Sequence, residues 1–316
     1  MAHELVAEVW RGDFLESVHH GSVVALAPSG TAVLSVGSPD EVCYPRSSNK
    51  PVQALAMLRN GLDLDRELLA LACASHSGED FHVDGVQRIL SGAGLGFDDL
   101  RCTPGLPIGE RALVAHHALG RGAEPKYMNC SGKHAAMLAT CVANGWSTAD
   151  YLDPAHPLQT AIATTLAELA GEPVGAVGVD GCGAPLLGIG LTGLARAFGA
   201  IAAAEPGTPE HRVATAMGGH PEWVGGTGRD VTALMRAIPG SVAKDGAEGV
   251  YAIGLPDGSA AACKIADGSS RARTVVLAAA LRALGVDVPR ELASVPVLGH
   301  GEPVGAIRPA FAPVPA

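Results

Sequence analysis

The sequence of 316 residues has few aromatic residues, few charges and no basic run. Aromatic residues make up 4% and charged residues 17%, against 47% hydrophobic residues. Acidic side chains outnumber basic ones by 32 to 22, which gives a formal net charge of −10 at pH 7. Nucleic acid and anionic membrane surfaces are therefore poor candidate partners. An anionic substrate would have to be held by local cations.

Signals for export, membrane insertion and disulfide bonding are also missing. The first residues, "MAHELVAEVWRGDFLES", carry charges throughout and lack the apolar core of a signal peptide. The most apolar stretch begins at Ala184 but is interrupted by Arg196 and several glycines, so it predicts buried helices and no membrane span. Seven widely spaced cysteines, an odd number, fit a reducing compartment better than a disulfide framework. We expect a cytoplasmic protein.

Strand-like patterns occupy both ends of the chain. The segments "LVAEVWRG", "GSVVALAPSG" and "TAVLSVGS" form an early set, with a hairpin turn at 27–31, and residues 249–268 form a late set. A Pro/Gly-rich tail closes the chain. The intervening patterns are mostly helical, and we expect helices at 51–59, 82–90, 133–143, 157–169, 185–204 and 231–238, with another at 271–285.

This order predicts an α/β (α+β) protein. Residues from about 5–38 and 240–316 would build one sheet, and residues from about 50–235 would form a helix-rich lobe. We find no clean linker, so residues 1–316 are interpreted as a single discontinuous unit. A cleft at the seam between sheet and lobe would be a common place for a site. No glycine-rich phosphate loop and no HExxH motif is present.

Ser47 and Lys50 form the first candidate pair, in "CYPRSSNKPVQALAMLRNG". At helical spacing they share one face, and a neutral lysine amine could take the serine proton. The flanking Pro45 and Pro51 indicate a helix start, whose free N–H groups could stabilise an oxyanion. The alternative is an ordinary helix start with a solvated lysine. A second Ser-x-x-Lys, from Ser241 to Lys244, is interpreted as a surface strand or turn.

Three further stretches carry polar residues in tight turns or apolar surroundings. In "ACASHSGED" the hydroxyl of Ser77 could face a cleft, or Ser77 could cap a helix together with Asp80. Cysteine, histidine and aspartate in "YMNCSGKHAAML" and "GVDGCGAP" could make a zinc site, or the cysteines could be buried structural residues. Lys264 stands among apolar neighbours, where a lysine is unexpected, and could face either the cleft or solvent from an edge strand.

Seven motifs in order resemble the rhizobial-type L-asparaginases, often labelled asparaginase II. They are "RSSNKPVQALAML", "ASHSGED", "NCSGKHAAML", "VDGCGAP", "GHPEWVGGTGRDVTALM", "KDGAEGVYAIGLPDG" and "CKIADGSSRA". The resemblance runs from about Val9 to Arg308. It implies a fold similar to serine β-lactamases and glutaminases, which is a helix–sheet–helix sandwich with a helical lobe. It also implies hydrolysis of L-asparagine, and a homodimer.

The resemblance also assigns roles to individual residues. Ser47 with Lys50, and Ser77 with Lys264, match two catalytic Ser-Lys pairs. The side chains of Cys130, Lys133 and Cys182 match a zinc-binding group. Arg46, Asp180 and His134 match positions that line the substrate pocket.

Three rival functions follow from the same residues. A β-lactamase- or esterase-like serine hydrolase shares the Ser-x-x-Lys layout, although the sequence lacks the K-[ST]-G strand signature of β-lactamases. A non-catalytic protein that binds amino acids or zinc would bind asparagine without releasing ammonia. A zinc-dependent amidohydrolase would lose all turnover to a chelator.

Overall fold

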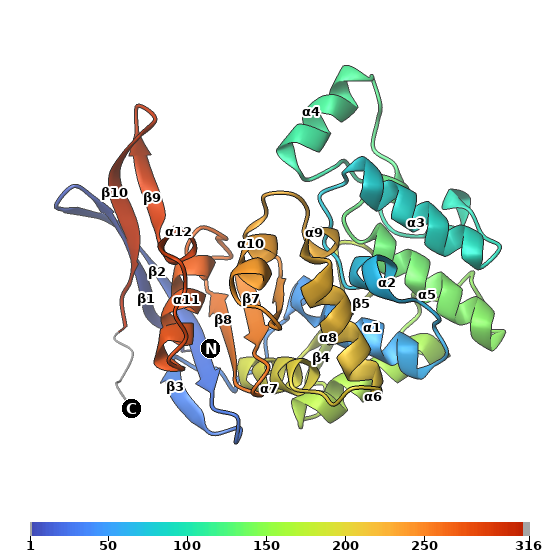
Figure 1. The fold of residues 1–316 in the computed structure, drawn as a ribbon, viewed down its shortest axis with the longest axis horizontal. Coiled ribbons are helices and arrows are strands. Elements are labelled where there is room, and N and C mark those ends of the chain that lie inside the picture. Colours follow the sequence, from blue (N-terminus) through green and yellow to red (C-terminus); the bar gives the residue numbers. More distant parts are fainter. Residues whose placement is uncertain (1, 312–316) are drawn as a thin grey trace.

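The computed structural model describes residues 2–311, which form one large sheet, a small hairpin and a set of helices (Figure 1). The strands are β1 (Glu4–Arg11), β2 (Phe14–Leu26), β3 (Ala32–Val36), β4 (Ala176–Val179), β5 (Pro185–Gly188), β6 (Val242–Asp245), β7 (Val250–Gly254), β8 (Ala260–Ile265), β9 (Val295–Gly299) and β10 (Glu302–Pro309). The α-helices are α1 (Lys50–Arg59), α2 (Arg66–Ala72), α3 (Asp80–Gly92), α4 (Glu110–Ala118), α5 (Ser131–Asn144), α6 (Pro157–Ala170), α7 (Leu191–Ala202), α8 (Pro209–Gly219), α9 (Pro221–Val224), α10 (Asp230–Ala237), α11 (Arg273–Ala283) and α12 (Arg290–Ala293). Three 3-10 helices complete them: η1 (Arg46–Asn49), η2 (Phe97–Asp99) and η3 (Pro125–Tyr127).

The large sheet joins the two ends of the chain through antiparallel pairing. Its order is β6-β7-β8-β2-β1-β10-β9, with β3 paired to β2. Val24 of β2 lies opposite Ala262 of β8, and Val9 of β1 lies opposite Ile307 of β10. The predicted turn at 27–31 is confirmed, because the N–H of Gly30 donates to the carbonyl of Ala27 between β2 and β3. β6 is the edge strand at one end of this sheet.

Helices cover both faces of the sheet. Every residue of β7 is buried, and neighbouring residues of a strand point to opposite faces, so both faces must be covered. Both α7 and α11 pack against β2, β7 and β8. A Cβ at Gly254 would lie 2.1 Å from the carbonyl oxygen of Phe198 in α7, so the glycine permits this close approach. The predicted α/β fold, with a helix–sheet–helix sandwich beside further helices, is confirmed.

Some expected elements differ from the structure. The expected helix at 185–204 is two elements, because residues 185–188 pair with β4 and only residues 191–202 are helical. Ile189 and Gly190 separate the two elements, and Gly190 is the N-cap residue of α7. The helices α2, α4 and α8 were missed, and the Pro/Gly-rich tail contains the hairpin of β9 and β10.

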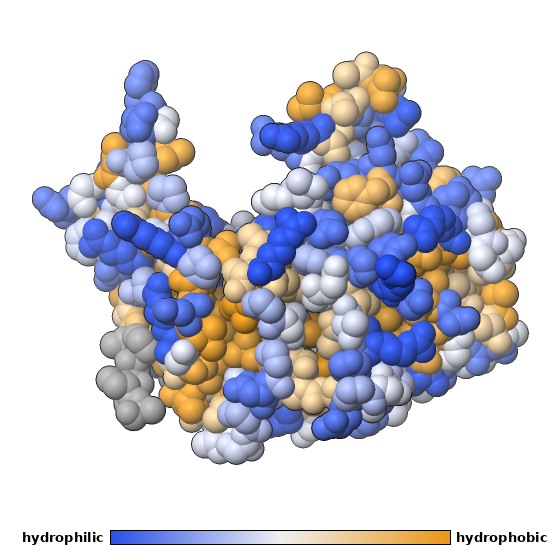
Figure 2. Space-filling view, in the orientation of Figure 1, coloured by the Kyte–Doolittle hydropathy of each residue, from blue (hydrophilic) through white to orange (hydrophobic). Residues whose placement is uncertain are grey.

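The molecule is hollowed between two projections (Figures 1 and 2). The hairpins of β1–β2 and β9–β10 form one projection and α4 forms the other. Only His116 of α4 is buried. None of the helices within residues 2–311 has both the length and the apolar character that crossing a bilayer requires.

Candidate active site

Ser47 lies in η1, directly before α1. Arg46 has a φ of +52°, which turns the chain sharply into η1, and Pro51 occupies the first turn of α1. Ser47 is partly exposed, whereas Lys50 is buried with 1% of its surface exposed. The predicted helix start is therefore confirmed, and the alternative of a solvated lysine is wrong.

The amine of Lys50 reaches away from α1 to the segment that follows α2. Its Nζ atom donates to the carbonyl of Ala74 and to the hydroxyl of Ser75, 3.0 Å away. Within the described residues Ser47 is not among its hydrogen-bond partners. The structure thus joins Lys50 to Ser75, a serine that the sequence interpretation did not select. The cue was its place in a run of small residues directly after an apolar helix.

The segment that carries Ser75 is held on both sides by backbone and side-chain hydrogen bonds. The N–H of Ser75 donates to the carbonyl of Val224, 3.0 Å away, and the N–H of His76 donates to Asn129 at the same distance. The buried His76 ring lies 2.8 Å from Ser131 Oγ through Nε2, and its Nδ1 accepts the N–H of Gly78. Burial lowers the pKa of His76 well below its ordinary value. The ring is therefore neutral, and its two hydrogen bonds hold this segment in position.

Ser77 faces the loop before α10. Its hydroxyl donates to the carbonyl of Gly225, 2.9 Å away, and a Cβ at Gly226 would lie 1.9 Å from Ser77 Oγ. The helix-capping interpretation is wrong, since Glu79 is the N-cap residue of α3 and makes no side-chain cap. Ser77 lines a cavity of about 520 Å³ together with Arg111 and residues 227–229.

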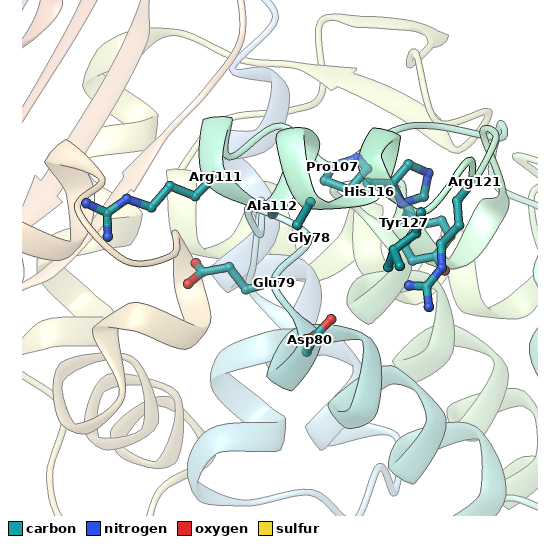
Figure 3. Close-up of a pocket in the computed structure, with 11 residues that line it drawn as sticks. Gly78, Glu79, Asp80, Pro107, Arg111, Ala112, His116, Arg121 and Tyr127 are labelled. Carbon is teal, nitrogen blue, oxygen red and sulfur yellow. The ribbon is translucent and has the colours of Figure 1, made fainter.

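A neighbouring cavity of about 260 Å³ lies between the start of α3 and α4. Glu79 and Arg111 stand at one end of it, and His116, Arg121 and Tyr127 gather at the other (Figure 3). Glu79 also accepts the N–H of Thr227 at 2.8 Å, so it connects this cavity to the one that Ser77 lines.

Lys264 lies on β8 and is half-buried. Its Nζ atom donates to the backbone carbonyls of Glu248 and Ile265. β8 pairs with β7 on one side and β2 on the other, so the edge-strand interpretation is wrong. Lys264 lines a cavity of about 330 Å³ with Arg46, Glu248 and apolar neighbours. The structure does not join Lys264 to Ser77, because the two line different cavities and have different hydrogen-bond partners.

Lys244 is a buried lysine whose charge interacts with that of Lys50. The interpretation of its Ser-x-x-Lys as a surface strand or turn is wrong, because Ser241 and Lys244 are both 0% exposed. Burial lowers the pKa of Lys244 to about 8, with Asp245 opposing this and Lys50 adding to it. The hydroxyl of Ser48, next to Ser47, donates to the carbonyl of Lys244. The sequence feature that could have indicated a role for Lys244 is Lys-Asp-Gly at the end of an apolar strand, which differs from the K-[ST]-G signature at one residue.

Arg46 and Asp180 form an ion pair beside Ser47. The Nε atom of Arg46 lies 2.9 Å from Asp180 Oδ1, and its Nη1 lies 3.7 Å from the exposed carboxylate of Glu248. Burial opposes ionisation of Asp180, but Lys133 and Arg46 outweigh it and hold the pKa of this carboxyl below its usual range.

The predicted metal group converges behind this ion pair. Lys133 Nζ lies 3.2 Å from Cys182 Sγ, which lies 3.4 Å from Asp180 Oδ2. A hydrogen bond between the two thiols lowers the pKa of Cys130 and raises that of Cys182. Burial disfavours the charged form of Lys133, but the neighbouring thiols outweigh it and raise its pKa. The three residues named from the sequence are thus brought together.

His134 adjoins the same group from α5, where it directly follows Lys133. Its Nδ1 lies 2.7 Å from the Tyr151 hydroxyl, and its buried Nε2 has no hydrogen-bond partner. Burial lowers its pKa to about 4, with Lys133 adding to this and Cys182 opposing it. Two thiols and an imidazole nitrogen are donor types that zinc prefers. Within residues 2–311, however, no group of three or more His, Cys, Asp or Glu side chains is close enough together to hold a metal ion, so Lys133 is the third donor that Cys130 and Cys182 would use.

The arrangement provides the parts that acyl transfer requires. A partly exposed serine stands at a helix start, a buried amine lies one turn away, and the charge of a second buried lysine interacts with that of the amine. A guanidinium group adjoins the serine and can bind a carboxylate.

Comparison with known proteins adds the family. No curated protein matches the chain. Among solved structures, a β-lactamase from Mycobacterium bovis has 13% identity and a TM-score of 0.44, with 79% of this chain and 88% of that chain covered. A protein named Mglu has 14% identity and a TM-score of 0.36, with 84% and 66% covered. These two similarities carry no argument about activity. The family model of L-asparaginase II matches residues 7–309, which is nearly the whole chain, and so the chain belongs to this family of amidohydrolases, as its motifs predicted.

Proposed function

We propose that the chain hydrolyses the side-chain amide of L-asparagine to L-aspartate and ammonia through a serine ester. The observation that carries the proposal is the buried amine of Lys50, which is hydrogen-bonded to Ser75 and lies one helical turn after Ser47. Membership of the L-asparaginase II family supports amide hydrolysis as the reaction.

Ser47 is the proposed nucleophile and Lys50 its base. Ser47 is partly exposed, so its Oγ can reach a substrate carbonyl, and the Ser47 proton passes to the amine of Lys50. The attack forms a tetrahedral oxyanion, which needs hydrogen-bond donors near Ser47. The first two residues of α1 offer none, because the N–H of Lys50 donates to the Ser47 carbonyl and Pro51 has no N–H. The amide nitrogen then leaves as ammonia after taking the proton from Lys50, and a β-aspartyl ester remains.

Deacylation uses the same groups in reverse. Lys50 accepts a proton from water, the water oxygen attacks the ester, and Ser47 recovers its proton as aspartate leaves. Ser75 is hydrogen-bonded to Lys50 and is the proposed relay for these protons. Ser77 has no chemical step in this proposal; its hydroxyl donates to the carbonyl of Gly225 and so fixes the loop before α10. The second cation of the site is Lys244 in this proposal, since the contacts of Lys264 are with Glu248 and Ile265.

Arg46 is the proposed partner of the substrate α-carboxylate. It stands next to Ser47, and a carboxylate can accept from its guanidinium group. Asp180 orients Arg46 through the 2.9 Å ion pair and is the candidate partner for the α-ammonium group. His134 is fully buried next to the cysteines, so we propose that it supports this wall and makes no direct contact with substrate.

Zinc would be held by Cys130, Lys133 and Cys182, and the unpaired Nε2 of His134 is a further donor nearby. When bound, zinc would fix these side chains and the adjoining Asp180 as a structural and substrate-orienting ion. Both Cys182 and Lys133 must lose a proton to bind it, so binding would release protons.

The experiment is ammonia release from L-asparagine and L-glutamine by the wild type and by Ser47→Ala, Ser75→Ala and Ser77→Ala, at fixed zinc. Loss of activity in Ser47→Ala, with partial loss in Ser75→Ala, supports the assignment. Ser29→Ala, in the exposed β2–β3 turn, is the matched control for removal of a hydroxyl. Activity that survives Ser47→Ala moves the nucleophile to Ser75 or Ser77. No ammonia from the wild type with either amide overturns the proposed function.

Cytoplasmic location and homodimeric assembly stay predictions. Sedimentation of the purified chain tests the second directly.

A further inference from the structure

The carboxylate of Asp245 is the meeting point of three cationic side chains. It lies 2.7 Å from Lys244 Nζ through Oδ1, and 3.0 Å from Arg229 Nη2 and 3.1 Å from Arg273 Nη2 through Oδ2. Asp245 is only 4% exposed and Lys244 is fully buried. Buried charges in contact at these distances depend on one another, since removal of one partner leaves the others uncompensated.

Lys244 and Asp245 are consecutive residues of β6, whose side chains would ordinarily point to opposite faces. The Lys244 side chain nevertheless returns to its neighbour, and its Nζ donates to both the carboxylate and the backbone carbonyl of Asp245. The orientation of the ammonium group is therefore set by Asp245.

This end of β6 is also fastened to the segment that carries Ser47. Ser48 Oγ donates to the carbonyl of Lys244, and a Cβ at Gly246 would lie 2.6 Å from the carbonyl oxygen of Pro45. A shift of Asp245 would consequently move the start of α1 as well as Lys244.

Arg229 connects the same carboxylate to the second serine segment. It belongs to the loop between α9 and α10, in which Gly225 accepts the hydroxyl of Ser77. Arg273, on α11, also pairs with Asp230, whose Oδ2 lies 3.0 Å from the same Nη2 atom. Asp245 is thus the common partner of β6, the 225–229 loop and α11.

From these contacts we propose that Asp245 is a positioning residue, which keeps the Lys244 ammonium charged and oriented and ties it to the loop that holds Ser77. This inference rests on the proposed function only in taking Lys50 as the base. In that function the Lys244 ammonium supplies the second positive charge of the site, which Asp245 holds in place.

The charged and titratable groups around Lys244 decide the direction of the test. They are Asp245 on β6, Lys50 on α1, Cys73 at the end of α2, Arg229 before α10, Asp230 on α10, Tyr251 on β7 and Arg273 on α11. Among them Asp245 raises the pKa of Lys244, whereas Lys50 and Arg229 lower it. Removing Asp245 or Arg229 should therefore move the titration of Lys244 in opposite directions.

The experiment is the pH dependence of kcat for asparagine hydrolysis by the full-length chain and its variants. In Asp245→Asn the alkaline limb should move to lower pH by about one unit or more, with KM changed less than kcat. In Arg229→Gln the alkaline limb should move to higher pH. Asp230→Asn is the matched control, because it removes a carboxylate from Arg273 without touching Lys244, and it should lower thermal stability while leaving the limb in place.

Carbon-13 NMR titration of the Lys244 side chain, assigned through Lys244→Arg, gives the same shifts without relying on activity. Shifts of opposite sign in the two variants support the proposal even if the wild type hydrolyses a different amide. An unmoved Lys244 titration in Asp245→Asn or Arg229→Gln, with stability alone reduced, overturns it and leaves Asp245 as a structural ion-pair partner. If Asp245→Asn does not fold, Arg229→Gln decides, since Arg229 is partly exposed and its substitution is milder.

Discussion

Lys50 donates a hydrogen bond to Ser75, 3.0 Å away and 25 residues later in the chain, although Ser47 stands only one helical turn before it. The amine of Lys50, which belongs to α1, therefore makes its hydrogen bonds to the segment after α2. In the proposed mechanism Ser47 acts as the nucleophile and Ser75 relays the proton. The hydrogen bonds to Ala74 and Ser75 explain why a lysine is tolerated at a position with 1% exposure.

Replacement of Lys50 by methionine should remove the base while keeping an apolar side chain of similar length. We expect kcat to fall by about 10²–10⁴-fold, which is the usual contribution of a positioned general base. Initial rates of ammonia release measure it, and thermal unfolding shows whether the variant is folded. Lys126→Met is the control, since Lys126 is a partly exposed lysine paired with Glu124. A Lys50→Met variant with wild-type kcat would place the base elsewhere.

Gly226→Ala should displace Ser77 from its position in the site. A Cβ at this position would lie 1.9 Å from Ser77 Oγ and 2.5 Å from Ser77 Cβ, so Ser77 or the loop must move. We expect a loss of kcat of about tenfold or more, which is about 1.4 kcal/mol in the barrier. Steady-state kinetics measure it.

Gly228→Ala is the matched control for that substitution. Gly228 lies in the same loop, also at positive φ, but a Cβ there would have nothing within 4 Å. It should cost about 1 kcal/mol of folding stability through backbone strain alone and leave kcat near the wild-type value. Equal kinetics for the two alanine variants would mean that the position of Ser77 does not matter.

Stability should decline between about pH 6.5 and pH 4 because buried histidines are held neutral. Burial lowers the pKa of His82 and of His134 to about 4. The unfolded chain binds protons at these rings as the pH falls below 6.5, whereas the folded chain does not, so stability present at neutral pH is lost on acidification. Each ring should account for roughly 2 kcal/mol of unfolding free energy between pH 7 and pH 5.

Urea unfolding of the wild type and of His82→Gln at pH 7 and pH 5 measures this contribution. The loss of unfolding free energy on acidification should be smaller in His82→Gln by about that amount. His117→Gln, at an exposed position of α4, should show the full wild-type loss. Identical losses in His82→Gln and the wild type would show that His82 protonates freely in the folded chain.

Zinc binding should depend on Cys182. The wild type, purified with zinc, should hold about one ion per chain, and Cys182→Ser should lose most of it, since this thiol lies between Lys133 and Asp180. Metal content by atomic emission measures it, and Cys141→Ser, a buried cysteine within α5, should keep the wild-type content. Chelation should raise KM for asparagine more than it lowers kcat. Complete loss of kcat on chelation would favour the zinc-dependent mechanism instead.

Local patterns in the amino-acid sequence specify most of the helices and the turn between the first strands. The α1, α5, α6, α10 and α11 helices follow from local periodicity and from prolines or glycines near their ends, which act over a few residues. The sequence also specifies the family, because seven ordered motifs leave little freedom, and it locates Ser47, Lys50 and the group of Cys130, Lys133 and Cys182.

Which groups come into contact is established by the folded chain and could not be predicted locally. Lys244 looks like a surface lysine in sequence because a short strand carries no sign of what covers it, and here β6 is covered by η1 and by α10. Lys264 looks like a catalytic cation for the same reason, yet its register on β8 directs its amine to backbone carbonyls of Glu248 and Ile265. The partner of Lys50 was decided by the path of the chain after α2, which brings Ser75 within 3.0 Å. Such contacts join residues far apart in the chain, and no local pattern encodes the distance between them.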